Sequence, residues 1–410
     1  MIMDKKKKQM VFFCSVAPYV MIYKIAKEFK KKGYETILVT ISGKDKFDVK
    51  SFEDAFDKIL CSDFQFFKPS IKSIPYFLKK SLGFLKFLIS LKMLKPYVWF
   101  GIGRTNWQIM LAHKYFFRKY PFIFFEYDLN SHFFSSRQEA RGWRVPNFEI
   151  NAEKYCFENA DGIMHKGAPD ELNVLDGRIF SKINLPDLKI NFLPYCSKDY
   201  VIPLNKNKLS KKDGELHLVF IGGLFDDPAS NKYENELVTS ILNNKIHFHN
   251  YAKLQHLSPK ESYEYTSKKF GKFLENPYFH LHPALDPKEI IKEISKYDFG
   301  VWFSGNYYKR KGLEIKYSTG NKLSSYLEAG IPLIYDERLE FVNLLLKKYN
   351  LNLAFNNKNF NSFFKNLKNL NYNSIEKNVQ RARKDFSVEK HFPRLEKFVK
   401  KVVARKNKIS

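Results

Sequence analysis

This chain alternates short apolar runs with helix-like patterns along most of its length, and that alternation constrains its fold more than any other feature. Runs such as residues 11–14 and 121–125 are apolar at nearly every position. Strands of that kind are buried on both faces, which is typical of parallel sheets covered by helices. The pattern therefore predicts an α/β fold built on doubly wound parallel sheets.

The alternation occurs twice, on either side of a polar, turn-rich segment at residues 203–214. Because 410 residues exceed the size of one ordinary core, we expect two Rossmann-like domains in tandem, at residues 1–204 and 205–385. Strands are predicted near residues 11–14, 36–40, 58–61, 97–100, 121–125, 162–165, 190–193, 216–221, 246–248, 278–281, 299–303 and 332–335. Helices are predicted at residues 18–32, 74–94, 107–117, 151–158, 287–296, 322–329, 339–348 and 393–405, the last with Pro393 in its first turn.

The chain carries a net charge of +27, from 70 Lys and Arg against 43 Asp and Glu. Such an excess attracts anionic partners, such as a phosphate-bearing substrate or an acidic membrane face, and a Lys-rich source composition produces it equally well. Residues 75–94 mix aromatic and basic side chains, as a helix resting on an anionic membrane does, although a core helix fits the same pattern. No readout helix or base-stacking platform is evident, so nucleic-acid binding is not expected.

The four cysteines, Cys14, Cys61, Cys156 and Cys196, form no C-x-x-C pair and lie in apolar surroundings. Buried reduced thiols are the simplest interpretation, which favours a reducing compartment. Four lysines precede an apolar run near the N-terminus, as in a signal peptide, but that run contains Pro18 and continues into an amphipathic helix pattern. We therefore expect a cytoplasmic protein without a transmembrane helix, in peripheral contact with the inner face of the membrane.

Ligands of open parallel sheets bind beyond the carboxyl ends of the strands, so the segments that follow the strands matter most. Among these, residues 318–334 are the most informative, because Gly320-Asn321 opens a helix that Gly330 ends before a strand. With Asn321 as its cap and Lys322 in its first turn, this helix start offers an anion site suited to a diphosphate. On the pattern alone, a solvated Lys322 is the favoured interpretation.

The segment resembles the donor-binding motif of the GT-B glycosyltransferases of group 1, similar to family 4, in which a Lys begins a helix that runs into a Gly-x-Pro strand. The matching residues here are Lys322, Tyr326, Leu327, Ala329, Gly330 and Pro332. The order of further segments resembles the same fold over most of the chain, at residues 11–40, 159–164, 218–223, 297–301 and 385–388.

The resemblance implies a nucleotide-sugar donor in a cleft between two Rossmann-like domains, no metal or other cofactor, and a C-terminal helix, residues 386–410, that crosses back to the N-terminal domain. The donor-binding residues that it implies are Gly222, Gly223, Ser304, Gly305, Asn321, Lys322, Ser325 and Glu328. Two positions depart from the family pattern. Ser325 stands where a Glu commonly binds the donor ribose, and Gly223 stands where an Arg is often found. Ribose recognition is therefore in doubt, and a structural role for Glu328 stays open.

On the acceptor side, Glu126, Asp128 and His132 follow a buried strand. An acid at this place deprotonates or orients an acceptor hydroxyl, and the alternative is a capped loop whose acids only serve hydrogen bonds. Three further residues lie after strands of the same domain and are expected to contact the acceptor, namely Ala17, Pro18 and Arg104.

The pairs His247/His249 and His280/His282 have the spacing of neighbours on one strand face, but no Cys or carboxylate near them in sequence completes a metal site. They are interpreted as sheet-packing residues, and no metal is expected. The predicted function is sugar transfer to a glycan or lipid-linked acceptor in surface polysaccharide synthesis. A nucleotide-sugar epimerase of the same fold and a degenerate, non-catalytic nucleotide-binding member are the alternatives, and retention versus inversion stays open.

Overall fold

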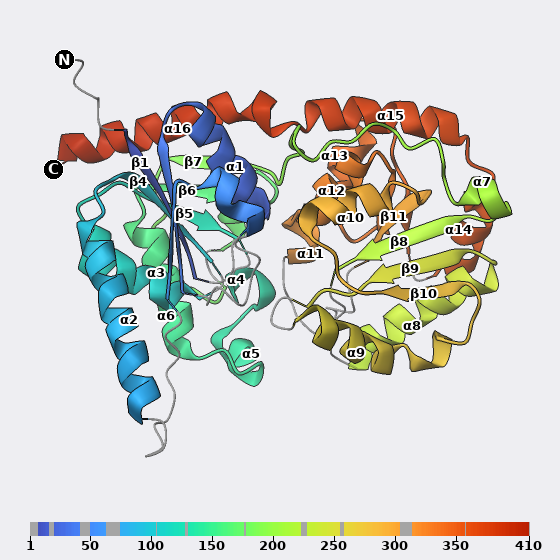
Figure 1. Cartoon of the computed structure of the whole chain (residues 1–410), viewed down its shortest axis with the longest axis horizontal. Coiled ribbons are helices and arrows are strands. Elements are labelled where there is room, and N and C mark those ends of the chain that lie inside the picture. The colour runs from blue at the N-terminus through green and yellow to red at the C-terminus, as the bar shows by residue number, and fades with distance from the viewer. Residues whose placement is uncertain are drawn as a thin grey trace. The chain divides into compact units, whose positions relative to one another are not determined.

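The computed structural model describes residues 7–15, 20–41, 50–62, 74–103, 105–127, 130–175, 178–222, 228–254, 258–303, 314–356 and 358–409. The chain forms two compact units, the first made of residues 1–193 and 391–410 and the second of residues 194–390 (Figure 1). The polar segment at 203–214 lies within the second unit. In the described part of the chain, no helix combines the length and the apolar character needed to cross a membrane.

The first unit contains a seven-stranded parallel sheet with the order β3-β2-β1-β4-β5-β6-β7. Its strands are β1 (Gln9–Cys14), β2 (Glu35–Thr40), β3 (Lys58–Cys61), β4 (Pro96–Ile102), β5 (Phe122–Glu126), β6 (Gly162–His165) and β7 (Lys189–Asn191). The order reverses between β1 and β4, and such a switch point is where open α/β sheets bind ligands. The core is strongly aromatic, with the rings of Trp99 and Phe122 stacked at 4.1 Å.

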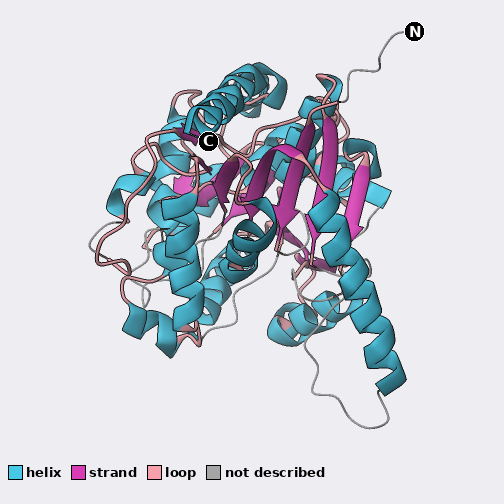
Figure 2. Cartoon of the chain, turned by 90° about the vertical axis from the view of Figure 1, so that its left-hand side faces the viewer, coloured by secondary structure: helices cyan, strands magenta, loops and turns pink. Residues whose placement is uncertain are grey.

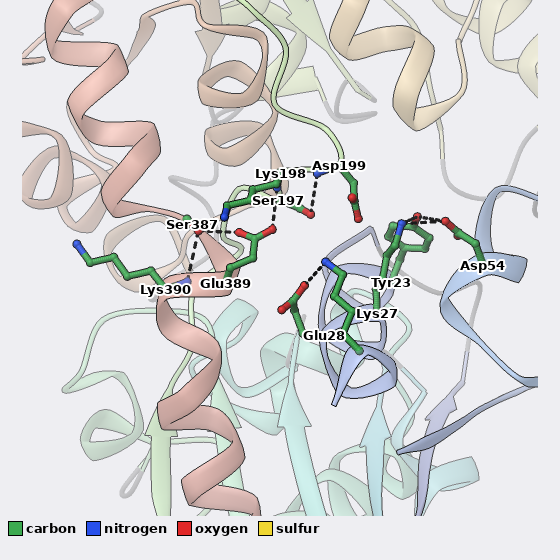
Figure 3. Close-up of polar contacts among 11 residues, drawn as sticks. Tyr23, Lys27, Glu28, Asp54, Ser197, Lys198, Asp199, Ser387, Glu389 and Lys390 are labelled. Atoms are coloured by element: carbon green, nitrogen blue, oxygen red, sulfur yellow. Dashed lines mark hydrogen bonds and ion pairs between the residues drawn. The ribbon is translucent and has the colours of Figure 1, made fainter. Parts of the chain in front are cut away.

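Helices lie on both sides of these strands (Figure 2), because strands with apolar side chains on both faces must be covered on both faces. They are α1 (Val20–Lys31), α2 (Ile74–Met93), α3 (Asn106–Ala112) with the π-helical turn η4 (His113–Phe117), α4 (Asn130–Phe133), α5 (Arg137–Gly142) and α6 (Asn147–Asn159). Short 3₁₀ turns occur at η2 (Lys50–Ala55) and η5 (Glu171–Val174). On α1, Lys27 bonds Asp54 of η2 at 2.9 Å (Figure 3), which ties the helix to the segment before β3.

The second unit contains a six-stranded parallel sheet with the order β10-β9-β8-β11-β12-β13. Its strands are β8 (His217–Ile221), β9 (His247–Tyr251), β10 (Phe279–His282), β11 (Phe299–Trp302), β12 (Leu333–Asp336) and β13 (Ala354–Phe355). Its helices are α7 (Ser210–Asp213), α8 (Pro228–Asn243), α9 (Pro259–Lys269), η6 (Gly271–Phe273), α10 (Pro287–Ile294), α11 (Glu314–Tyr317), α12 (Asn321–Ala329), α13 (Glu340–Lys347), α14 (Phe360–Leu367) and α15 (Tyr372–Asp385). The prediction of two parallel-sheet α/β domains is confirmed.

The last helix, α16 (Val388–Ile409), begins earlier than predicted, so Pro393 lies inside it rather than in its first turn. Ser387 explains the earlier start, because its Oγ accepts a hydrogen bond from Lys390 N at 3.3 Å and so caps the helix. The Ser387 hydroxyl also donates to Glu389 at 2.6 Å (Figure 3). The missing N–H of Pro393 leaves the carbonyl of Glu389 without its usual helical donor.

The chain enters and leaves the second unit through two segments that are hydrogen-bonded to each other. Cys196 N donates to Phe386 O at 2.7 Å, and Val388 N donates to Cys196 O at 2.7 Å. Lys198 N also donates to the Glu389 carboxylate at 2.8 Å (Figure 3). Beyond this point the chain returns to the first unit, where Phe392 packs edge-on against Phe29 and a side chain on Gly162 would collide with Val402.

Candidate functional site

In the second unit, the carboxyl end of β8 lies directly beneath the first turn of α12. Gly222 follows β8 with φ at +116°, a conformation that favours glycine. A Cβ on Gly222 would lie only 3.2 Å from Lys322 Nζ, so a side chain there would crowd the ammonium group. The structure therefore brings together Gly222 and Lys322, which the sequence predicts as donor-binding residues.

Helix α12 begins at Asn321 with Gly320 as its N-cap residue, so Asn321 is the first helical residue and not the cap. The first backbone N–H groups of a helix have no partner within it and carry the positive end of its dipole. Lys322 Nζ lies 5.2 Å from the centroid of the Phe220 ring, over the end of β8. Backbone donors, dipole and ammonium thus converge on one end of the sheet, where they suit a diphosphate.

Tyr326 holds α12 in this position. Its hydroxyl lies 3.0 Å from Val301 O on β11 and accepts a hydrogen bond from Ile221 N on β8 at 3.2 Å. The ring covers Gly300, where a Cβ would lie 2.3 Å from a Tyr326 ring carbon. The glycine of β11 therefore permits a buried tyrosine that fixes the helix to two strands of the sheet.

Several predicted site residues lie outside the described part of the chain. They are Gly223, Ser304 and Gly305 of the donor prediction and Asp128, Ala17, Pro18 and Arg104 of the acceptor prediction. Ser325 is half-buried in the middle of α12. The roles of Ser325 and of the residues outside the described part stay predictions.

Glu328 is buried on the side of α12 that faces the segment leading into the second unit. Its carboxylate accepts a hydrogen bond from Ser197 N at 2.7 Å, and its carbonyl accepts one from Ile202 N at 3.2 Å. The side chain is 1% exposed. These bonds tie α12 to the incoming chain and favour a structural role for Glu328.

We expect Glu328→Ala to lower the free energy of unfolding by about 1–3 kcal/mol, because Ser197 N would then be buried without an acceptor. Urea unfolding of the full chain measures this loss. Glu340→Ala is the matched control, since that side chain is 60% exposed and its removal should change stability by less than about 0.5 kcal/mol. Unchanged stability with a raised KM for the donor would show instead that Glu328 binds the donor.

In the first unit, a buried cluster of two glutamates and two histidines lies beyond the ends of β5 and β6. Glu126 Oε1 lies 3.1 Å from His132 Nδ1, and Glu171 Oε1 lies 3.4 Å from the same nitrogen. Glu171 Oε2 lies 3.3 Å from His165 Nδ1. We call these four residues the carboxylate–imidazole cluster. The structure therefore confirms that Glu126 and His132 are neighbours and adds two partners.

The cluster separates charge inside the protein. Burial would lower the pKa of His132, but the adjacent Glu126 and Glu171 raise it to about 9. Burial would raise the pKa of Glu126, but His132, with its hydrogen bond, lowers it instead. Burial, together with the charge of Glu126, raises the pKa of Glu171. Near neutral pH the cluster therefore holds an ionised Glu126 beside a protonated His132.

Supporting residues fix this geometry. Glu153 accepts hydrogen bonds from the backbone N–H groups of Asn130 and Ser131 at 2.9 and 3.0 Å, which anchors α4 and with it His132. A Cβ on Gly167 would lie 2.0 Å from Glu171 Oε2, so only glycine allows that carboxylate its place. Among the described residues, Glu126 Oε2 and His132 Nε2 are buried without a hydrogen-bond partner. Glu126, His132 and Glu171 also each offer one possible metal-ligand atom, and these atoms lie within 4.8 Å of one another.

Sequence reasoning missed His165, Glu171 and Glu153. His165 ends a predicted strand, so its position at the ligand-binding edge was available as a signal. Glu171 and Glu153 carry no such signal, because they reach the cluster from a 3₁₀ turn and from the middle of α6.

Comparison with known proteins gives a consistent result. Residues 242–394 match the model of the glucosyltransferase 3-like C-terminal domain. Sucrose-phosphate synthase from Thermosynechococcus elongatus is structurally similar with a TM-score of 0.69 and 11% identity, covering 97% of this chain and 100% of that one. HepE from Anabaena, solved with UDP and glucose, has a TM-score of 0.61 and 8% identity, covering 96% and 99%. A glycosyltransferase from Rickettsia africae has a TM-score of 0.59 and 12% identity, covering 97% and 99%.

The chain has the GT-B fold of glycosyltransferases, and residues 242–394 match a glycosyltransferase family model. A search of curated protein sequences returned no match. The family match begins within α8 and includes Lys322, Tyr326 and Glu328, whereas Gly222 and the carboxylate–imidazole cluster lie before it. Helix α12 therefore falls in the part of the chain that the family model matches.

Proposed function

We propose that this glycosyltransferase transfers glucose from UDP-glucose to a hydroxyl group of a glycan or lipid-linked acceptor during surface polysaccharide synthesis. The observation that carries the proposal is the close approach of Lys322 Nζ to Gly222 beneath the start of α12. The matched family is described as glucosyltransferase 3-like, and the similar HepE structure contains UDP and glucose. The family description supports a glucosyl group, and the HepE structure supports both a uridine nucleotide and glucose.

In this proposal, Lys322 and the first N–H groups of α12 stabilise the negative charge of the departing nucleotide diphosphate. Donors that are already in place cost no reorganisation when the charge develops. Gly222 keeps the approach to the phosphates open, because it places no side chain beneath the ammonium group. Lys322 contributes its charge to that stabilisation, and α12 contributes its backbone dipoles.

On the acceptor side, we assign proton handling to Glu126 and His132. The ion pair is buried at the end of β5, directly before the segment that contains Asp128. In this assignment the ionised Glu126 carboxylate accepts the proton of the acceptor hydroxyl as the hydroxyl oxygen bonds the glucosyl carbon and UDP leaves, and His132 holds that carboxylate in place.

A thermal-shift comparison of UDP, GDP, CMP and ADP tests the donor assignment. A ligand that binds only the folded state raises Tm, by an amount corresponding to about 2.7 kcal/mol at 100 times its Kd. We expect UDP to give the largest shift, followed by release of UDP from UDP-glucose when a sugar acceptor is added. Equal shifts of Tm with UDP, GDP, CMP and ADP would contradict the proposal. So would conversion of the donor without any acceptor.

We also propose that α2 makes peripheral contact with an anionic membrane from the cytoplasmic side. The helix exposes four apolar side chains at helical spacing, namely Leu82, Leu85, Ile89 and Met93, with exposed fractions of 51–74%. Lys86 and Lys92 are exposed among them, so that apolar and basic groups share one face. Its opposite face carries the buried Phe87 and Leu91 and packs in the first unit. An exposed apolar stripe with basic neighbours suits the interface of an acidic bilayer.

Co-sedimentation with phosphatidylglycerol vesicles tests this contact. We expect the double variant L85E/I89E to bind about tenfold or more weakly, since two apolar side chains of about 1.5 kcal/mol each are lost. Leu344→Glu is the control, because Leu344 is 66% exposed but lies in the second unit. Equal sedimentation of the double variant and the wild type would refute the assignment of α2.

A further inference from the structure

Five imidazoles gather on one face of β8, β9 and β10, and a carboxylate completes the group. They belong to His217, His247, His249, His280 and His282. Asp213, the last residue of α7, adds its carboxylate at the edge of this face, a partner that is not evident from sequence spacing. Its Oδ2 lies 2.9 Å from His217 Nε2 and 3.8 Å from His247 Nε2. The three ligand atoms lie within 4.8 Å of one another.

The second nitrogen of each of these two imidazoles is already engaged. His217 Nδ1 lies 2.9 Å from His249 Nε2, and His247 Nδ1 lies 2.8 Å from His280 Nε2. The rings of His217 and His247 are nearly parallel, with centroids 4.3 Å apart. Metal-binding histidines are typically oriented in this way, by a hydrogen bond on the nitrogen that does not bind the metal. Both Nε2 atoms are therefore held toward the same point.

The carboxylate of Asp213 is positioned from its other side. Glu215 N donates to Asp213 Oδ1 at 3.0 Å, which leaves Oδ2 facing the two imidazoles. Gly214, with φ at +80°, makes the turn that brings α7 back onto the start of β8 (Figure 1). The Asp213 side chain is 43% exposed, whereas those of His217 and His247 are 5% and 16% exposed. An ion can therefore reach the group from solvent without any rearrangement of the sheet.

We propose that Asp213, His217 and His247 bind a divalent cation of the zinc class. Two imidazole nitrogens and one carboxylate oxygen suit Zn²⁺, Co²⁺ or Ni²⁺, whereas Mg²⁺ and Ca²⁺ prefer oxygen ligands alone. Water completes the coordination. When no cation is bound, the His217 Nε2–H group donates to Asp213, and the cation replaces that proton.

We assign this cation site a structural role because of its position in the second unit. His217 and His247 are the first residues of β8 and β9, while Gly222 follows the opposite end of β8. The five residues of β8 span about 16 Å, so the proposed cation lies far from α12, which begins above the other end of the strand. It joins α7 to the amino ends of two strands and thereby stabilises the fold. The proposal is independent of the sugar that the enzyme transfers.

Titration of the metal-stripped full chain with Co²⁺, followed by visible absorption, tests the site. We expect one Co²⁺ to give the absorption of a nitrogen- and oxygen-ligated ion, and D213N and H247Q each to weaken its binding by about 10–100-fold. Zn²⁺ at 100 times its wild-type Kd should raise Tm of the wild type by about 5–10 °C and that of each variant by about half as much or less. Circular dichroism verifies that both variants fold.

His132→Gln serves as the control, because the carboxylate–imidazole cluster of the first unit offers a second set of possible ligands. It should leave the Co²⁺ spectrum and the Zn²⁺ effect on Tm unchanged. The proposal is overturned if D213N and H247Q bind Co²⁺ as the wild type does, if His132→Gln abolishes the spectrum in their place, or if the wild type shows neither absorption nor a Tm shift.

Discussion

Replacing Lys322 with alanine is expected to lower kcat/KM for sugar transfer by about 10²–10³-fold while leaving the fold intact. The ammonium group lies above Gly222 at the end of β8, where the nucleotide diphosphate is proposed to gain charge as it departs. Because an interaction that strengthens in the transition state acts on turnover, most of the loss should appear in kcat. Steady-state kinetics with UDP-glucose at saturating acceptor measures both constants.

Lys316→Ala is the matched control for Lys322. It removes a lysine from the preceding helix, α11, where the side chain is 51% exposed and forms a surface ion pair with Glu340. We expect its kcat/KM to stay within about twofold of the wild type, because an exposed pair contributes little. Normal turnover by Lys322→Ala would contradict the proposed stabilisation of the leaving group. Equal losses of kcat/KM in both variants would show only a general effect of positive charge.

Replacing Glu126 with glutamine is expected to lower kcat by about 10²–10⁴-fold, the range in which positioned proton transfer contributes. The change keeps the shape of the side chain but removes the anion that does most to raise the pKa of His132 to about 9. The pKa of His132 should therefore fall, and the alkaline limb of the pH–rate profile should move to lower pH. NMR titration of the His132 ring provides a direct measurement.

The same charge pair predicts how stability depends on pH. A histidine whose pKa is raised from 6.5 to about 9 by folding contributes its full stabilisation below pH 6.5 and loses it as the pH rises through 9. This loss should be smaller in Glu126→Gln. Glu149→Gln is the control, since Glu149 is also buried in the first unit but binds the backbone of Asn106. If both variants kept wild-type kcat and the same pH profile, the pair would be structural only.

The sheets were predictable because their strands are buried on both faces and so consist of uninterrupted apolar runs. The run at 162–165 coincides with β6, and that at 299–303 exceeds β11 by one residue. β13 has only two residues at the sheet edge, too few to show a pattern, and was missed. The last helix was placed too late because proline is common in first turns, whereas the cap at Ser387 is a local contact that pattern alone does not reveal.

The site was predictable where it follows from strand ends and less so where it depends on long-range contacts. Gly222 and Lys322 meet because one ends a strand and the other opens a helix of the same sheet. Glu328, by contrast, binds the N–H of Ser197, 131 residues away in sequence. Asp213 reaches His247 through a turn at Gly214, so its carboxylate was not recognisable as a partner. The periodicity of apolar residues predicts which side chains are buried. Contacts such as Glu328 with Ser197 depend instead on which distant segments the fold brings together.

The discontinuous first unit has a consequence for biosynthesis. Its sheet is covered in part by residues 391–409, which are synthesised after the second unit, while the second unit is a single stretch whose two ends bond at Cys196 and Phe386. We expect the second unit to mature first, although domains generally fold in the order in which they are made. Until residues 391–409 have been synthesised, β6 lacks Phe398 and Val402 over Gly162, so the nascent chain presents an apolar surface that chaperones recognise.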